Sequence, residues 1–276
     1  MPRPELSALH VYPVKGVRGT SPGEAEVQPW GLAADRRWMV VDADHRQVTQ
    51  REQPRLALAA AEPLPDGGLE LSAPAMPKLR VAVPGDGTGT VTVSVWRDRV
   101  PAAPADVGSD WFSAYLGRPV LLVYLADPRA RPVDPEFGRE GETVGFADGF
   151  PLLVTTTASL EALNELVAEG GHADEGPLPM DRFRPNLVVS GTQSWAEDGW
   201  RRLRVGQVVF RVAKPCGRCV VTTTDQRTAR RGREPLRTLA RHRRFGSQLV
   251  FGQNLVPEST GRVRSGDQVE VLDPVP

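Results

Sequence analysis

Short runs of β-branched and aromatic residues, separated at close intervals by turn residues, are the feature that most restricts how this chain can fold. Clear examples in the first hundred residues are 37–41, 69–71, 79–83 and 91–96. The 276 residues include 27 glycines and 26 prolines, and the chain has no low-complexity tract. Such abundance favours many tight turns between short strands. The pattern predicts a mainly β fold, a barrel or a sandwich, with a few short helices added (α+β).

Turn and cap signals organise the rest of the chain. Residues 84–89 (PGDGTG) predict a hairpin connection between 79–83 and 91–96, and residues 126–142 predict a charged, proline-rich loop. We predict helices over 110–116, 158–168 and 235–243, and Thr157 is the expected N-cap of the second. The remaining expected strands are 6–14, 56–61, 120–125, 151–154, 186–189, 203–205, 208–212, 220–224, 249–256 and 268–272.

The composition changes near residues 101–108 (PAAPADVG), which predicts a boundary there. We therefore expect an N-terminal β-barrel-like module over residues 1–105. A second β-barrel domain with short helices is expected over residues 106–276, with its core at about 122–272.

Charge and hydropathy narrow the classes of partner. The formal net charge is zero, so neither a nucleic acid nor an anionic membrane is expected as a partner. The sequence has no run of about 18 apolar residues, so no transmembrane helix is expected. The N-terminus lacks the pattern of a secretory signal, and the expected compartment is the cytoplasm.

The two cysteines, Cys216 and Cys219, form a C-x-x-C motif. Two cysteines do not make a disulfide-stapled secreted domain, and structural zinc needs more ligands than this motif supplies. A strand predicted over 220–224 would place Cys219 at a strand start, near Lys214 and Arg218, which could favour its thiolate. A thiolate is a soft ligand for a transition metal. Alternatively, both cysteines are buried small hydrophobes, and a thioredoxin-like pair is disfavoured because the motif is not expected to open a helix.

Several cations follow expected strand ends, which is the pattern of a phosphate-binding pocket. Lys15 lies in YPVKG, Arg36 in AADRRW, and Arg184 in DRFRPN. Arginine can fork onto phosphate oxygens, although each of these residues could equally be a solvated surface arginine. Asp148, in FADGF, could orient a ligand or relay a proton, or it could be a turn residue before Gly149. Motifs of P-loop, Rossmann and α/β-hydrolase proteins are absent from the sequence.

Taken in order, these segments resemble one family. RFRPNLVVSG, KPCGRCVVTTTD, EPLRTLARHR and FGQNLVPESTGRVRSGDQVEVL resemble the MOSC domain, named for the C-terminal domain of molybdenum cofactor sulfurase. LSALHVYPVKG, GLAADRRWMVVD and VTQREQPRLALA resemble the β-barrel module that precedes MOSC in many members. The resemblance covers nearly the whole chain, and the pattern is similar to that of the amidoxime-reducing components.

The resemblance implies a molybdenum cofactor (molybdopterin) and a set of residues that hold it. Cys219 would be the molybdenum ligand, with Cys216 a neighbour that does not bind the metal. Asp148 would lie near the metal as a catalytic residue. The implied cofactor-binding residues are Lys15, Arg36, Arg184, Asn186, Thr222 and Thr223. Family members also give an expectation of pyridoxal phosphate binding.

The activity implied is the reduction of N-hydroxylated compounds. Some bacterial relatives carry a ferredoxin-like domain after MOSC. This sequence ends without one, so no iron–sulfur cluster is expected, and electrons would come from a separate ferredoxin- or flavin-type protein. Relatives often have hydroxyl residues where this chain has Gly149 and Phe150, which affects substrate choice. Two alternatives share the same residues: a non-catalytic carrier of the molybdenum cofactor, and a sulfur carrier with a persulfide on Cys219.

Overall fold

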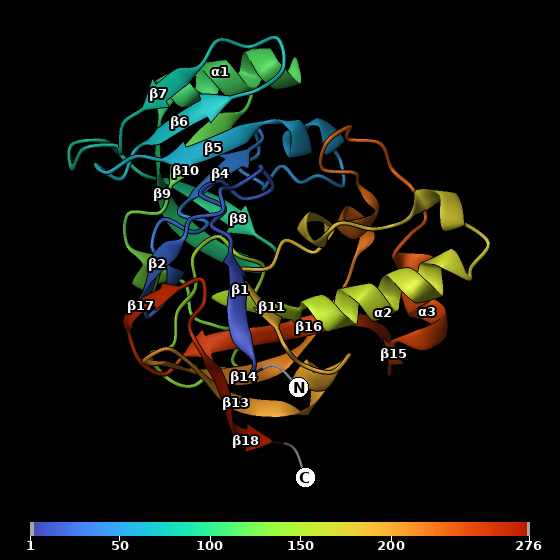
Figure 1. The fold of residues 1–276 in the computed structure, drawn as a ribbon. Coiled ribbons are helices and arrows are strands. Elements are labelled where there is room, and N and C mark those ends of the chain that lie inside the picture. The colour runs from blue at the N-terminus through green and yellow to red at the C-terminus, as the bar shows by residue number, and fades with distance from the viewer. Residues whose placement is uncertain (1–2, 275–276) are drawn as a thin grey trace.

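The computed structural model describes residues 3–274, and strands dominate it (Figure 1). Its largest sheet has the order β1-β12-β11-β16-β14-β13-β18, with β15 paired to β16. Antiparallel pairs predominate, and β11 and β12 run parallel. The strands are β1 (Glu5–Leu9), β11 (Leu152–Thr156), β12 (Leu187–Ser190), β13 (Trp200–Val205), β14 (Val208–Gly217), β15 (Arg244–Phe245), β16 (Gln248–Pro257) and β18 (Val269–Pro274).

Three smaller sheets complete the described chain, in the orders β4-β10-β9-β8, β17-β2-β3 and β5-β6-β7. Most of these strands belong to the N-terminal half, which forms the upper part of Figure 1. Their bounds are β2 (Glu24–Gln28), β3 (Gly31–Leu32), β4 (Trp38–Val41), β5 (Ala60–Pro63), β6 (Leu69–Ser72), β7 (Leu79–Val81), β8 (Val91–Val95), β9 (Asp98–Pro104), β10 (Leu121–Tyr124) and β17 (Gly261–Arg264).

The helices are α1 (Asp106–Leu116), α2 (Thr157–Ala168) and α3 (Leu236–His242), close to their predicted places. Helix α1 buries Trp111, Phe112 and Tyr115 against the strands of the upper part. In α2 the N-cap is Thr156, one residue before the predicted Thr157, and its side chain accepts a hydrogen bond from the amide of Ser159. The prediction of a mainly β protein with short helices is therefore confirmed.

The core packs as two main clusters, and the chain crosses between them. One cluster lies under α1, β4, β5, β6 and β10; the other lies beneath the largest sheet. Strand β1, at the start of the chain, pairs with β12 in the largest sheet, and β17, near its end, pairs with β2. Helix α1 and strand β10 pack with the strands that precede them, and the domain boundary at residue 105 stays a prediction.

Three local predictions are wrong. Residues 84–89 do not form a hairpin, because β7 pairs with β6 while β8 pairs with β9 across the two-residue turn at Trp96. The expected strand over 56–61 begins instead as a 3-10 turn at Pro54–Leu58, where proline fits the first turn. Residues 220–224 are not a strand either: Val220–Thr223 form a 3-10 turn.

Candidate functional site

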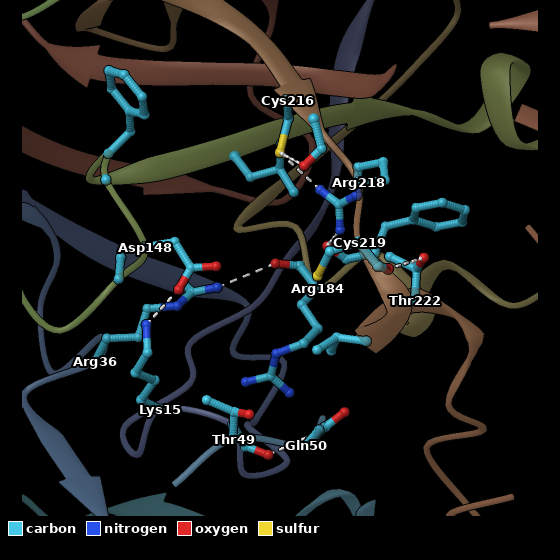
Figure 2. A pocket seen from close by; sticks show the side chains of 18 of the residues that line it. Lys15, Arg36, Thr49, Gln50, Asp148, Arg184, Cys216, Arg218, Cys219 and Thr222 are labelled. Carbon is cyan, nitrogen blue, oxygen red and sulfur yellow. Dashed lines mark hydrogen bonds and ion pairs between the residues drawn. The ribbon is translucent and has the colours of Figure 1, made fainter. Parts of the chain in front are cut away.

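An open cavity lies where the two parts of the molecule meet. Its walls come from separate segments, which Figure 2 shows converging from opposite sides. The lining residues are Lys15, Gly16, Arg36, Val48, Thr49, Gln50, Arg51, Trp96, Ala147, Asp148, Gly149, Phe150, Leu152, Leu153, Arg182, Phe183, Arg184, Asn186, Cys216, Gly217, Arg218, Cys219, Val221, Thr222 and Asn254.

The thiol of Cys219 is on this wall. Strand β14 ends at Gly217, and Cys219 then caps the 3-10 turn, so the motif opens a short helical turn and not a strand. The Cys219 carbonyl accepts hydrogen bonds from the amide of Thr222 at 3.0 Å and from its hydroxyl at 2.8 Å. Within residues 3–274 its half-buried sulfur has no hydrogen-bond partner, so the thiol is available to a ligand.

The neighbouring basic residues are engaged elsewhere. Arg218 donates one N–H to the sulfur of Cys216 at 2.9 Å and another to the carbonyl of Phe183 at 2.7 Å. Lys214 places its ammonium 4.0 Å from the ring centroid of Phe137. Both side chains had been expected to favour a thiolate at Cys219, and the structure directs them to other groups.

Lys15 and Asp148 form an ion pair inside the cavity (Figure 2). The Lys15 ammonium lies 2.5 Å from Asp148 Oδ1 and donates to the Phe146 carbonyl at 2.7 Å. Burial lowers the pKa of Lys15, and Asp148 only partly offsets this effect. The protein atoms around Asp148 remove part of its hydration and would raise its pKa, but Lys15 and the indole N–H of Trp96 outweigh this effect and hold the pKa well below its ordinary range.

Asp148 is therefore a carboxylate at neutral pH. Its side chain is 70% exposed, because it faces the open cavity. Solvent in the cavity screens its charge, so the direction of the pKa shift matters here and its energy does not convert directly into stability.

Arg36 and Arg184 lie on the aromatic ring of Tyr12, at 4.7 and 4.2 Å from its centroid. Burial lowers the pKa of Arg184 to about 10, and the nearby Arg36 adds to this effect. For Arg36, burial opposes its charge, but the ion pair with Asp35 at 2.5 Å outweighs burial and raises the pKa. Two cations held this close to each other create a site that favours an anion.

The backbone supports the same two arginines in an unusual way. Arg36 has φ +48° and Arg184 has φ +54°, values that L-residues rarely adopt. Such strain gathers at functional sites. Asn186 fixes the pair: its side-chain oxygen accepts from Arg36 at 3.1 Å and from the Leu153 amide at 3.2 Å, and its amide donates to the His10 carbonyl. Asn186 thus lines the cavity with its polar atoms already engaged.

The threonines after the cysteine are separated by the 3-10 turn. Thr222 is among the residues that line the cavity and Thr223 is not, and cofactor binding by either residue stays a prediction. Its hydroxyl donates to the Val220 carbonyl at 2.8 Å, and its carbonyl accepts from Arg182 at 3.0 Å. In a strand these side chains would have alternated, whereas the turn directs only Thr222 toward the cavity.

The electrostatic character of the cavity is basic. Within residues 3–274, six lining side chains are cations and one, Asp148, is a carboxylate. Sequence reasoning had selected only three of these cations. The lining residues that it missed include Thr49, Gln50, Arg51, Trp96 and Arg218. The segment VTQRE was part of the family pattern, but no residue in it carried a recognisable signal of its own.

The arrangement can bind an anionic group of considerable size beside a free thiol. The cavity is lined on several sides by cations, and the arginines offer paired N–H donors. In the part of the chain that the structure describes, no helix is long and apolar enough to cross a membrane.

Comparison with known proteins gives matches along almost all of the chain. The family model of the MOSC N-terminal beta barrel domain matches residues 3–119, and that of the MOSC domain matches residues 141–270. The chain is 31% identical over 292 residues to mitochondrial amidoxime-reducing component 1 of Homo sapiens, covering 97% of this chain and 82% of that protein. The Mus musculus protein of the same name is 32% identical over 290 residues, with the same coverage. Molybdenum cofactor sulfurase of Danio rerio is 32% identical over 279 residues, but only 32% of its length is covered.

Proposed function

This chain belongs to the MOSC family, and from that premise we propose that it is a molybdenum-cofactor-dependent oxidoreductase that reduces N-hydroxylated compounds. The observation that carries the proposal is the meeting of the Cys219 thiol with six cations in one cavity. The names of the relatives, amidoxime-reducing component and molybdenum cofactor sulfurase, support the same assignment.

The residues present fit the cofactor chemically. Molybdopterin carries a phosphate and two sulfurs, so it is a polyanion that needs several cationic donors. Cys219 offers the soft thiolate ligand that a transition metal prefers. Arg184 and Arg36, desolvated and close together, gain most from a bound anion, and Lys15 adds a third positive charge. Thr222 offers a hydroxyl on the cavity wall.

When bound, the cofactor would supply the two-electron chemistry that removes oxygen from an N–O bond. The chain's own residues would do the rest. Asp148 Oδ1 already accepts hydrogen bonds from Lys15 and Trp96. Lys15, whose pKa is lowered by burial, can give a proton to a departing oxygen and regain one from solvent in the open cavity, while the Asp148 carboxylate holds its amino group in place. The apolar residues Leu152 and Phe150 would limit the water around the substrate.

The same proposal includes a separate electron donor of the ferredoxin or flavin type and a cytoplasmic location. Gly149 and Phe150, in place of hydroxyl residues, make this end of the cavity less polar and would favour less polar substrates. Pyridoxal phosphate binding, expected from the resemblance, stays a prediction.

The decisive experiment pairs two cysteine variants, C219S and C216S, made in a host that synthesises the cofactor. Molybdenum per protein, by elemental mass spectrometry, should be near stoichiometric in the wild type and in C216S and should fall strongly in C219S. Reduction of benzamidoxime with a chemical reductant should follow the metal. Equal metal and activity in C219S would contradict the assignment.

The same measurements separate the alternatives. A loaded protein without turnover of any N-hydroxylated compound would favour a cofactor carrier. A metal-free protein with a persulfide on Cys219, detected by mass spectrometry, would favour a sulfur carrier.

A further inference from the structure

Trp96 is an exposed aromatic residue whose ring face the proposed chemistry does not use. It forms the two-residue turn between β8 and β9, where Val95 pairs with Asp98. Its φ is +56°, a conformation for which such turns normally use asparagine or glycine. It is 47% exposed, and it lines the cavity. A tryptophan at this position strains the turn backbone and exposes apolar surface to solvent. Because it stabilises neither the turn nor the surface, we interpret it as a ligand-binding residue.

The indole is nevertheless held in one orientation. Its N–H donates to Asp148 Oδ1 at 3.0 Å, and the guanidinium of Arg51 lies 4.5 Å from the ring centroid. Both partners also line the cavity. The ring is thus directed into the space beside Asp148 rather than left free in solvent.

A buried arginine ties the same hairpin to the Asp148 loop. Arg131, whose side chain is 2% exposed, donates to Asp98 at 2.6 Å. It also donates to the backbone carbonyls of Gly145 at 2.8 Å, of Ala147, and of Asp148 at 2.9 Å. Because one residue fixes both the hairpin and the loop, the position of Trp96 relative to Asp148 is set before any ligand binds.

We propose that Trp96 is a specificity-determining residue that selects planar aromatic N-hydroxylated substrates by stacking on them. The inference rests on the proposed function and names the substrate class of that site. An aryl amidoxime presents a flat ring joined to the N–O group, so stacking on Trp96 would bring that group to the side of Asp148. The cations of the cavity, Arg51 foremost, favour neutral or anionic substrates over cationic ones.

The test compares benzamidoxime, which has an aromatic ring, with acetamidoxime, which lacks one. The key variant is W96N, because asparagine tolerates positive φ and the turn keeps its conformation. Phe245, 44% exposed on β15 and outside the cavity lining, provides the control variant F245N. W96F keeps an aromatic face but loses the hydrogen bond to Asp148.

Binding to the loaded protein is measured by calorimetry without reductant, and kcat/KM with reductant. We expect W96N to weaken benzamidoxime binding and kcat/KM by about threefold to tenfold, the contribution of one aromatic pair. Loss of the hydrogen bond to Asp148 should affect both compounds alike, so the ratio of benzamidoxime to acetamidoxime in binding and in kcat/KM is the readout, and it should fall by that factor in W96N. W96F should keep most of this ratio, and F245N should match the wild type. Equal effects of W96N on both compounds, or none, would overturn the assignment. Selective binding of benzamidoxime through Trp96 without turnover of either compound would support Trp96 and contradict the proposed reaction.

Discussion

At the scale of single residues, the cavity contains cationic side chains whose charged form is disfavoured by burial and would be stabilised by a bound anion. Arg184 is the clearest case, because burial and Arg36 lower its pKa to about 10 while Tyr12 lies against it. An anion in the cavity would relieve this repulsion. A desolvated arginine such as Arg184 therefore binds an anion more strongly than a solvated surface arginine does.

Replacing Arg184 should therefore affect cofactor retention more than chemistry. Asparagine is the suitable replacement, since Arg184 has φ +54°. We expect R184N to contain at least about threefold less molybdenum per protein, as expected from loss of a charge-assisted contact, with turnover per molybdenum nearly unchanged. Elemental analysis together with activity per metal measures both. Full loading with normal activity in R184N would remove Arg184 from the site.

The pH dependence of stability should report Asp148. Its pKa is depressed in the folded protein, so its contribution is present above the unfolded value of about 4 and is lost as the pH falls through and below that value. In the cofactor-free protein, the wild type should melt at a higher temperature than D148N at pH 7. The gap should narrow below about pH 4. D86N, in an exposed turn, is the control, and a gap that does not change with pH would contradict the ion pair.

At the scale of elements, short polar contacts decide how segments begin. Thr156 caps α2, and its hydroxyl also lies 3.1 Å from Glu197, which is buried with raised pKa because burial disfavours its charge. Thr222 and Thr223 use their hydroxyls to close a 3-10 turn. Threonine, although β-branched, thus stabilises turns and helix starts where its side-chain oxygen hydrogen-bonds to nearby backbone groups.

The N-cap at Thr156 predicts different stability effects for alanine substitutions at the two adjacent threonines. T156A should lower the free energy of unfolding by about 1 kcal/mol, the usual cost of losing an N-cap. T157A should change it by less than about 0.5 kcal/mol, because alanine is favourable inside a helix. Urea denaturation followed by circular dichroism measures both. A larger loss in T157A would show that the helix begins one residue later.

At the scale of the whole molecule, the two main cores share strands. β1 joins the largest sheet from the start of the chain, and β17 returns from near its end to β2. Residues from both halves line the cavity. Its residues therefore depend on long-range pairing as much as on their own segments.

Because strands of each half pair with strands of the other, neither half should fold stably without the other. A fragment of residues 126–276 lacks β1 and β2, leaving β12 and β17 without these partners, and it should show no cooperative thermal transition. A chain nicked within the exposed residues 85–90 should remain associated and melt cooperatively, because the cut falls between separate sheets. Circular dichroism and size-exclusion chromatography test both. Cooperative melting of the fragment near the temperature of the intact protein would contradict the dependence.

The sequence predicted local features well and spatial pairing poorly. The helix over 158–168 and the strand over 69–71 follow from periodicity and caps, which are local. Lys15, Arg36 and Arg184 were selected through the family pattern and do line one cavity. Trp96 could not be predicted from local sequence, because its proposed role depends on a hydrogen bond to Asp148, which is distant in the sequence. The strand predicted over 220–224 is a 3-10 turn instead, because the hydroxyls of Thr222 and Thr223 bond to backbone carbonyls three residues earlier.

The position of β1 also sets the order of events during synthesis. Its main partner is β12, and Glu5 also bridges to Gln268, so β1 stays without its main partner until residues 187–190 have been made. Long-range pairing of this kind slows folding and leaves an apolar edge open to association. The largest sheet can be completed only once β18 has been made, and a chaperone that covers residues 5–9 until β12 emerges would increase the yield of the native state.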